Sequence, residues 1–305
     1  MALLDMIMSI GLPGAITQGI IWGMMAMGVY ITYKILDIAD LTVDGSFTTG
    51  GAVLVVCMTV YGMNVWTALL VAFIAGCLAG LLTGMFHTKF GIPAILSGIL
   101  TQFALYSINL RIMTRANVAL NVRKFNVILT SFDVTHALIT AVIFAAILIA
   151  ILYWFFGTEL GMSLRATGCN PNMSRANGIN TERNKILALI LSNGVVAMSG
   201  GLLAQYQGFA DINMGRGAIV IGLAAVIIGE VLFSKIYRNF ALRLTSAVVG
   251  GILYYIIITL VLRMGLKADD LKLLSAVVVA IFLGIPYWKS KISLKKSVKG
   301  DKDNA

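Results

Sequence analysis

Residues 157–185 read GTELGMSLRATGCNPNMSRANGINTERNK, a polar and basic stretch between two long apolar runs. In so hydrophobic a chain this stretch must lie outside the lipid. Asn170 is a favoured N-cap residue, Pro171 suits the first helical position, and Gly178 suits the left-handed position that ends a helix. The spacing therefore predicts one short helix that begins and ends at defined residues.

The residues next to this short helix indicate a folded, exposed element. Ile179 can pack back on Met173, and Asn180 or Thr181 can cap the long helix that follows. Basic residues flank the element, namely Arg165, Arg175, Arg183 and Lys185. A capped, basic helix of this kind suits docking to a partner protein. The alternative interpretation is an ordinary connector between two helices.

The composition of the whole chain indicates a polytopic membrane protein. Of its 305 residues, 59% are hydrophobic and only 12% are charged, whereas soluble domains carry about 25% charged residues. The net charge of +10 lies in loops and in the C-terminal tail, so we attribute it to membrane topology rather than to nucleic-acid binding. The three cysteines, Cys57, Cys77 and Cys169, lack metal or redox spacing.

Apolar runs divide residues 1–288, the expected transmembrane domain, into an all-α fold of eight or nine spans. An interfacial helix is expected at 1–12, and residues 289–305 are expected to form a basic, disordered cytoplasmic tail. The expected spans are 15–36, 52–61, 65–86, 92–112, 137–156, 186–206, 218–233, 244–262 and 271–288. Each of the four prolines, Pro13, Pro93, Pro171 and Pro286, falls at a boundary between these elements.

Residues 37–51, DIADLTVDGSFTTGG, are too polar for an ordinary lipid-facing helix. They predict a re-entrant or broken segment after the first span, which is tolerated only where protein or water surrounds it. Its acids either line a pathway or lie at a helix end near the surface. Polar candidates for a translocation path are Asp44, Ser46, Thr48, Gln102, Asn109 and Gln205. The amides among them more commonly serve packing by bonding a neighbouring helix.

The distribution of basic residues predicts the orientation in the membrane. With the lysine-rich tail in the cytoplasm, counting backwards places three basic loops on the cytoplasmic side, at 235–243, 157–185 and 87–89. Two basic connections, 111–124 and 263–272, fall outside and are exceptions to the rule. The N-terminus is then external unless residues 37–51 re-enter the membrane.

The text from Met162 to Phe233 resembles the permease family of bacterial ABC importers that includes the branched-chain amino acid and ribose systems. The resemblance rests on LRATGCNP at 164–171, on RANGIN at 175–180 and on the glycine-led run that ends in AAVIIGE at 230. Within the family the sequence is most similar to single-permease systems that import aromatic amino acids such as tryptophan. It departs from the family at Cys169, where Glu is common.

This resemblance implies that the short helix is a coupling helix seated in a groove of a cytoplasmic ATPase subunit. The residues implied in coupling are Gly168, Asn170, Pro171, Ser174, Arg175, Gly178 and Ile179. ATP and Mg²⁺ would bind the partner ATPase, since this chain has no G-x-x-x-x-G-K-[ST] loop and would carry no cofactor or enzymatic activity itself. The chain would lie in the bacterial cell membrane. Its other implied partners are a substrate-binding lipoprotein, a second permease copy and membrane lipid.

A secondary transporter driven by an ion gradient is the main alternative. Such a protein needs an ionisable coupling group deep in the membrane, and Asp44 is the one candidate for it. A membrane-embedded enzyme ranks last, because His87 and His136 are isolated near span ends and no nucleophile motif occurs.

Overall fold

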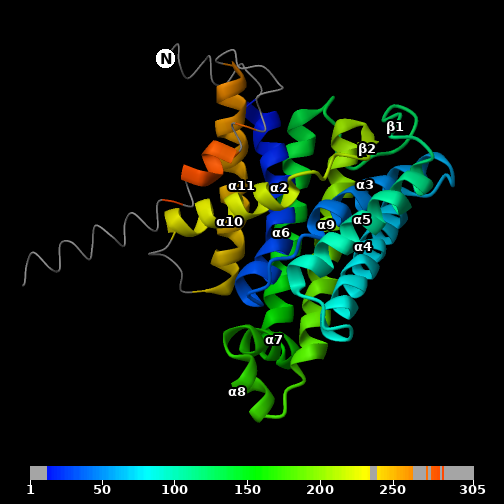
Figure 1. The fold of residues 1–305 in the computed structure, drawn as a ribbon. Coiled ribbons are helices and arrows are strands. Elements are labelled where there is room, and N and C mark those ends of the chain that lie inside the picture. The colour runs from blue at the N-terminus through cyan, green and yellow to red at the C-terminus, as the bar shows by residue number, and fades with distance from the viewer. Residues whose placement is uncertain (1–11, 234–238, 264–272, 274–275, 282–283, 285–305) are drawn as a thin grey trace, which may run out of the picture.

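The computed structural model describes residues 12–233, 239–263, 273, 276–281 and 284. The described residues are mostly helical, as predicted (Figure 1). The expected interfacial helix at 1–12, except for Leu12, and the expected tail at 289–305 lie outside the described residues. The expected span at 271–288 is described only in part.

Eleven helices and two short strands make up the described elements. The helices are α2 Leu12–Tyr30, the π-helix η1 Ile31–Ile35, α3 Val43–Thr59, α4 Val65–Thr88, α5 Ala94–Met113, α6 Val134–Gly157, α7 Glu159–Cys169, α8 Pro171–Ala176, α9 Thr181–Gln207, α10 Ala218–Phe233 and α11 Phe240–Arg263. Strands β1, Asn117–Ala119, and β2, Phe209–Asp211, pair antiparallel. This small sheet is the one departure from an all-helical architecture in the part of the chain that the structure describes.

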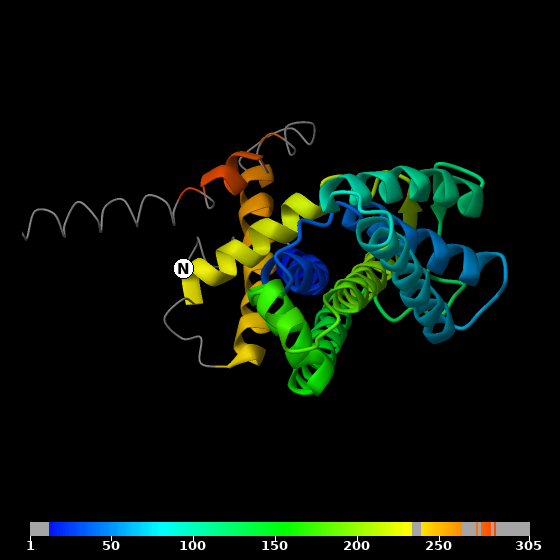
Figure 2. The ribbon, with the colours of Figure 1, turned by 60° about the horizontal axis from the view of Figure 1, so that its bottom comes forward.

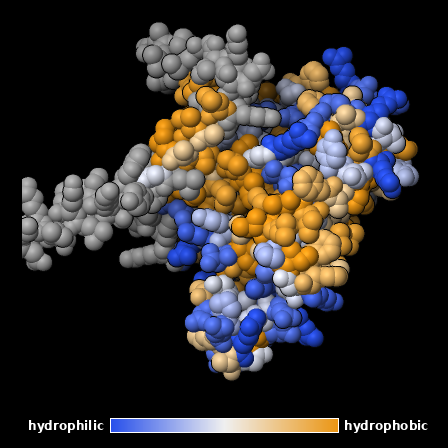
Figure 3. All heavy atoms as spheres, viewed as in Figure 1, coloured by the Kyte–Doolittle hydropathy of each residue, from blue (hydrophilic) through white to orange (hydrophobic). Residues whose placement is uncertain are grey.

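The long helices form a body of membrane-spanning size. Six described helical segments are long and apolar enough to cross a membrane: α2 with η1, α4, α5, α6, α9 and α11. Helix α9 packs against α2, α3 and α4, whereas α10 runs across the upright helices (Figure 1) and crosses α11 obliquely in the turned view (Figure 2). Figure 3 shows an apolar band between a hydrophilic end, where α7 and α8 lie, and polar side chains at the opposite end. The structure is thus that of a polytopic helical membrane protein, while the span count of eight or nine stays a prediction.

The break after the first span is confirmed, but it is shorter than predicted. Of the predicted residues 37–51, only 37–42 have irregular backbone, and α3 begins at Val43. Two of the hydroxyls that suggested irregular backbone bond within the helix, where Thr48 Oγ1 donates to the Asp44 carbonyl and Thr49 Oγ1 to that of Gly45. Such bonds to the preceding turn let polar side chains sit in a buried helix at little cost.

Glycines allow the central helix α9 to approach its neighbours closely. A Cβ built at Gly200 would overlap the carbonyl of Phe47 on α3, and one built at Gly50 would overlap that of Ala197 on α9. Helix α4 approaches α9 in the same way at Gly80, next to Leu189. Small residues of this kind are typical of helix interfaces inside membranes.

Candidate functional site

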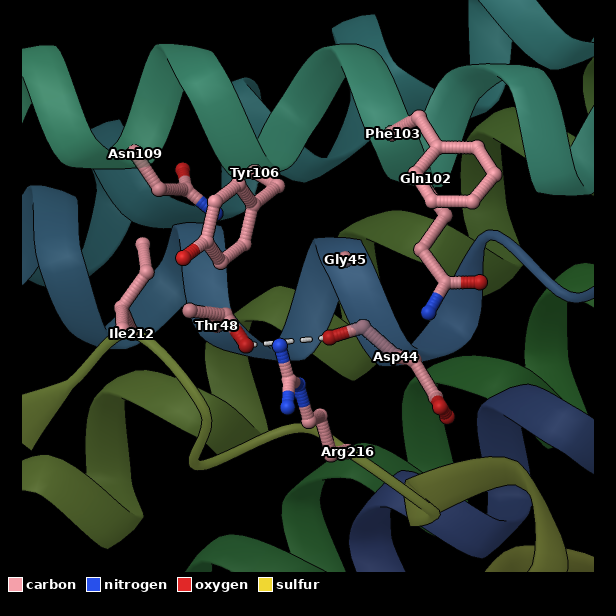
Figure 4. Close-up of a pocket in the computed structure, with 9 residues that line it drawn as sticks. All are labelled: Asp44, Gly45, Thr48, Gln102, Phe103, Tyr106, Asn109, Ile212 and Arg216. Carbon is pink, nitrogen blue, oxygen red and sulfur yellow. Dashed lines mark hydrogen bonds between the residues drawn. The ribbon is translucent and has the colours of Figure 1, made fainter.

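Four of the six polar residues predicted to line a path come together in one pocket, here called the α3–α5 pocket (Figure 4). Its volume is about 540 Å³. Helix α3, helix α5 and the segment between β2 and α10 supply its lining, which is Asp44, Gly45, Thr48, Gln102, Phe103, Tyr106, Asn109, Ile212 and Arg216. The predicted residues in this group are Asp44, Thr48, Gln102 and Asn109.

The other two predicted path residues lie outside this lining and make interhelical contacts. Ser46 Oγ donates to Asn193 Oδ1 at 2.6 Å, which joins α3 to α9. The Ile128 N–H donates to Gln205 Oε1 at 3.0 Å, which ties the connection before α6 to α9. Both side chains are fully buried. Their contacts are those of packing residues.

Asp44 holds the start of α10 against α3. The backbone N–H groups of Gly217 and Ile219 donate to its two carboxylate oxygens, each at 2.9 Å. The N–H of Gly215 donates to Thr48 Oγ1 at 3.1 Å. A carboxylate on the first N–H groups of a helix is favoured by hydrogen bonding and by the helix dipole. Asp44 therefore acts as an N-cap supplied by another helix, and it fixes the segment that carries the adjacent Arg216.

Asn109 is the fully buried polar side chain of the pocket lining that has no hydrogen-bond partner among the described residues. Its side chain is fully buried, and neither its Oδ1 nor its Nδ2 forms a hydrogen bond to a described residue. Two exposed rings precede it on the same helix, Tyr106 about one turn away with 43% and Phe103 nearly two turns away with 71% of its surface accessible. Burying an amide without a hydrogen-bond partner costs about 1–3 kcal/mol of stability, so such amides are uncommon in folded proteins and call for an explanation.

The sequence analysis missed Arg216, which supplies the positive charge of the pocket. Its side chain is exposed, and it forms no salt bridge to the carboxylates of the described residues. Figure 4 shows its guanidinium extending toward Asp44 and Thr48. The available signal was an arginine between two glycines, Gly215 and Gly217, directly before an apolar run.

The predicted short helix is confirmed as α8. Asn170 Oδ1 accepts from the Met173 N–H at 3.0 Å, and Gly178 has a φ of 78°, in the left-handed region. The Ile179 N–H donates to the Ser174 carbonyl at 3.0 Å and so closes the C-terminal end. Ser174 points inward and is fully buried, whereas most other residues of α8 are exposed.

Arg175 is exposed on α8 and also contacts the start of α9. Its Nε donates to Thr181 Oγ1 at 2.9 Å. Asn180 caps α9 as predicted, since its Oδ1 accepts from the Arg183 N–H at 3.0 Å. The guanidinium is therefore held in place on the surface instead of extending freely.

Helix α7, which the sequence analysis did not identify, connects α8 to the helical body. Asn184 Nδ2 on α9 donates to Ser163 Oγ at 3.0 Å and to Thr167 Oγ1 at 2.8 Å on α7. A Cβ at Gly168 would overlap the carbonyl of Ile35 at the end of η1. The segment of α7 and α8, residues 159–178, here called the α7–α8 segment, thus touches the chain directly before the break at 37–42.

The buried acid of the break, Asp40, is hydrogen-bonded to α9. Asp40 is 2% exposed, and its Oδ1 accepts from the Thr42 N–H at 2.9 Å. Its Oδ2 accepts from Asn193 Nδ2 at 2.7 Å. A continuous set of contacts therefore leads from the α7–α8 segment through η1 and the break to α3, which lines the pocket.

Comparison with known proteins gives the family. Residues 12–287 match the model described as branched-chain amino acid transport system, permease component. The chain is 42% identical over 287 residues to a tyrosine transport system permease protein of Clostridioides difficile (strain R20291), covering 94% of each chain. It is 36% identical over 271 residues to an uncharacterized protein of Rickettsia prowazekii (strain Madrid E), covering 88% of this chain and 95% of the relative.

Among solved structures, the chain is similar to PsaBC from Streptococcus pneumoniae in complex with Fab, with a TM-score of 0.37, 15% identity, and coverage of 81% of this chain and 88% of that one. The family match spans nearly all of the described helices and agrees with their apolar, multi-pass arrangement. This chain is a multi-pass membrane protein that belongs to the family of branched-chain amino acid transport system permease components.

Proposed function

We propose that this chain is the membrane-spanning permease of an ATP-driven ABC importer for an aromatic amino acid. The substrate class is supported by the relative named as a tyrosine transport permease, with 42% identity. Two copies would form the pathway, two cytoplasmic ATPase subunits would drive it, and an extracytoplasmic lipoprotein would deliver the substrate. ATP and Mg²⁺ would bind the ATPase subunits and not this chain.

The observation that supports a coupling role is the shape and position of the α7–α8 segment, which we therefore call the coupling segment. Helix α8 projects at the hydrophilic end of the molecule, capped at both ends and exposed on most of its surface (Figures 1 and 3). Exposed basic side chains lie on α8 itself, at Arg175, and on the helices before and after it, at Arg165 of α7 and Arg183 of α9. A small rigid helix with these properties fits a groove in a partner subunit.

The internal contacts suggest how ATPase closure would reach the pathway. Force on α8 would pass to α7, whose Gly168 touches the Ile35 carbonyl at the end of the first membrane helix. Movement there would shift the break at 37–42 and, with it, the start of α3. Rigid helices that tilt about a short irregular segment make a hinge-type switch.

An ion-gradient mechanism has less support, because buried Asp40 and half-buried Asp44 already accept hydrogen bonds that hold the fold together. Asp44 accepts two backbone N–H groups of α10, and Asp40 accepts from Thr42 and Asn193. A coupling group must exchange its proton or ion during transport. Both carboxyl groups instead have fixed structural partners.

The test is uptake of labelled tyrosine into proteoliposomes that contain the permease, its ATPase and the binding lipoprotein. We expect uptake to require ATP and to be unaffected by a protonophore. The Arg175→Glu variant should lose uptake, because it reverses the charge offered to the ATPase. Thr181→Val is the matched control, since it removes only the internal partner of Arg175 and should keep most activity. Uptake that follows an ion gradient without ATP would refute the proposal.

A further inference from the structure

We propose that the α3–α5 pocket is a substrate site of the permease itself, selective for amino acids whose aromatic ring carries a hydrogen-bonding group. This inference rests on the proposed function and extends it, because a permease served by a binding lipoprotein needs little affinity of its own. Asn109 is proposed as the residue that determines specificity. The pocket's volume, about 540 Å³, lies in the range of small-molecule sites, about 300–1,000 Å³.

The charged groups of the pocket suit the backbone of a free amino acid. Arg216 offers an exposed guanidinium, the side chain best matched to a carboxylate, and it has no salt-bridge partner among the described residues. Half-buried Asp44 lines the same pocket, and a carboxylate has about four lone pairs, so it keeps acceptor capacity beyond the backbone N–H groups that it binds at the start of α10. One positive and one negative group in a single pocket match the opposite charges of an α-amino acid.

The aromatic rings of α5 provide an apolar surface for the substrate side chain. Phe103 and Tyr106 are large rings that remain 71% and 43% exposed, although both line the pocket. Their spacing of three residues places them on one helix face together with Gln102 and Asn109 (Figure 4). Rings so arranged favour stacking with another ring.

Asn109 adds a requirement for a polar group on that ring. Its amide is fully buried in the pocket wall, and its donor and acceptor both lack a described partner. A phenol hydroxyl can satisfy both amide atoms, and an indole N–H can satisfy the oxygen. Phenylalanine and the branched-chain amino acids would leave the amide unpaired. A site with a buried polar group rejects ligands that cannot bond it far more strongly than it rejects small differences in size.

The experiment measures equilibrium binding of labelled tyrosine, tryptophan and phenylalanine to the purified permease–ATPase complex without the lipoprotein. For the wild type we expect tyrosine and tryptophan to bind at least about tenfold more tightly than phenylalanine. In Asn109→Leu this ratio should fall to near one, because leucine fills the space without a polar atom. Ser107→Ala, an exposed position on the same helix outside the pocket lining, should keep the wild-type ratio.

A second variant tests the charged end of the pocket. Arg216→Gln should weaken binding of all three amino acids by similar factors and leave their ratio unchanged, since all share the same carboxylate. A wild type that binds the three equally, or an Asn109→Leu variant that keeps the ratio, overturns the inference. ATP-dependent uptake with the lipoprotein, measured on the same preparation, tests the proposed function separately. Normal uptake of tyrosine with no selective binding would therefore reject only the substrate site.

Discussion

Two buried asparagines, Asn193 and Asn109, show how the same side chain serves different purposes at the scale of single residues. Asn193 accepts from Ser46 and donates to Asp40 and to the Leu189 carbonyl, so both its oxygen and its nitrogen are hydrogen-bonded. Asn109 is equally buried but has no described partner. The Asn193 amide holds α3 and the break against α9, whereas the Asn109 amide keeps its donor and acceptor available in the wall of the pocket.

This difference predicts opposite effects of leucine at the two positions. Asn193→Leu would leave the Asp40 carboxyl and the Ser46 hydroxyl without their α9 partner, at a cost of about 1–3 kcal/mol for each group. Asn109→Leu removes an amide that is already unpaired, so its stability should equal or exceed that of the wild type. Thermal unfolding of the purified variants in one detergent checks this. Equal losses of stability at both positions would contradict the assignment.

Local chemistry allowed part of the site to be predicted from sequence. Asn170, Pro171 and Gly178 lie within nine residues of one another, so the start and end of α8 depend on neighbours in the chain. The hydrogen bonds between Asp44 and the N-terminus of α10 join residues more than 170 positions apart, and no hydrophobic periodicity in the sequence indicates such a contact. Asp44 could therefore be named from the sequence as a polar candidate for the translocation path, but its role as a cap could not be identified.

Hydropathy located the apolar helices well and the polar ones poorly. The run predicted at 218–233 coincides with α10, because apolar composition ends abruptly on both sides. Helix α7 was missed, since its short, mixed sequence of residues 159–169 has no lipid-length run. The start of α3 was placed too late, because residues 43–51 combine hydroxyls with glycines and look like a loop until their bonds to the helix and to α9 are known.

Two adjacent glycines of α9 test how closely the helices α3 and α9 pack. Gly200→Ala should prevent the close approach, because the new methyl group would overlap the Phe47 carbonyl, which is backbone and cannot move aside. Overpacking of this kind costs about 1–3 kcal/mol. Gly201→Ala is the matched control, since the nearest atom to its methyl group is a flexible one, Leu54 Cδ1 at 3.1 Å. We expect a lower folded yield and unfolding temperature for Gly200→Ala only, and similar values for both variants would contradict the packing.

At the scale of the whole molecule, two irregular segments interrupt the membrane body and meet at one place. The break at 37–42 leads into α3, and the segment after β2 leads into α10; Asp44 joins the starts of both helices. The pocket lies at this junction, and the coupling segment contacts the chain just before the first break. Through these contacts, movement of a docked ATPase would reach the pathway, provided that the coupling segment faces the cytoplasm.

The natural cysteines offer a direct measurement of that orientation. Cys169, next to the cap of α8, is exposed, whereas Cys57 is 7% exposed on α3 and Cys77 is half-buried on α4. A membrane-impermeant maleimide should therefore label Cys169 in inside-out vesicles and leave right-side-out vesicles unlabelled. Because α8 is proposed to seat in the ATPase, added ATPase should slow this labelling. The Cys169→Ser variant, which should abolish the signal, confirms the site of modification. Labelling from the external side would place the coupling segment on the wrong face for an ATPase and would remove the basis of the importer mechanism.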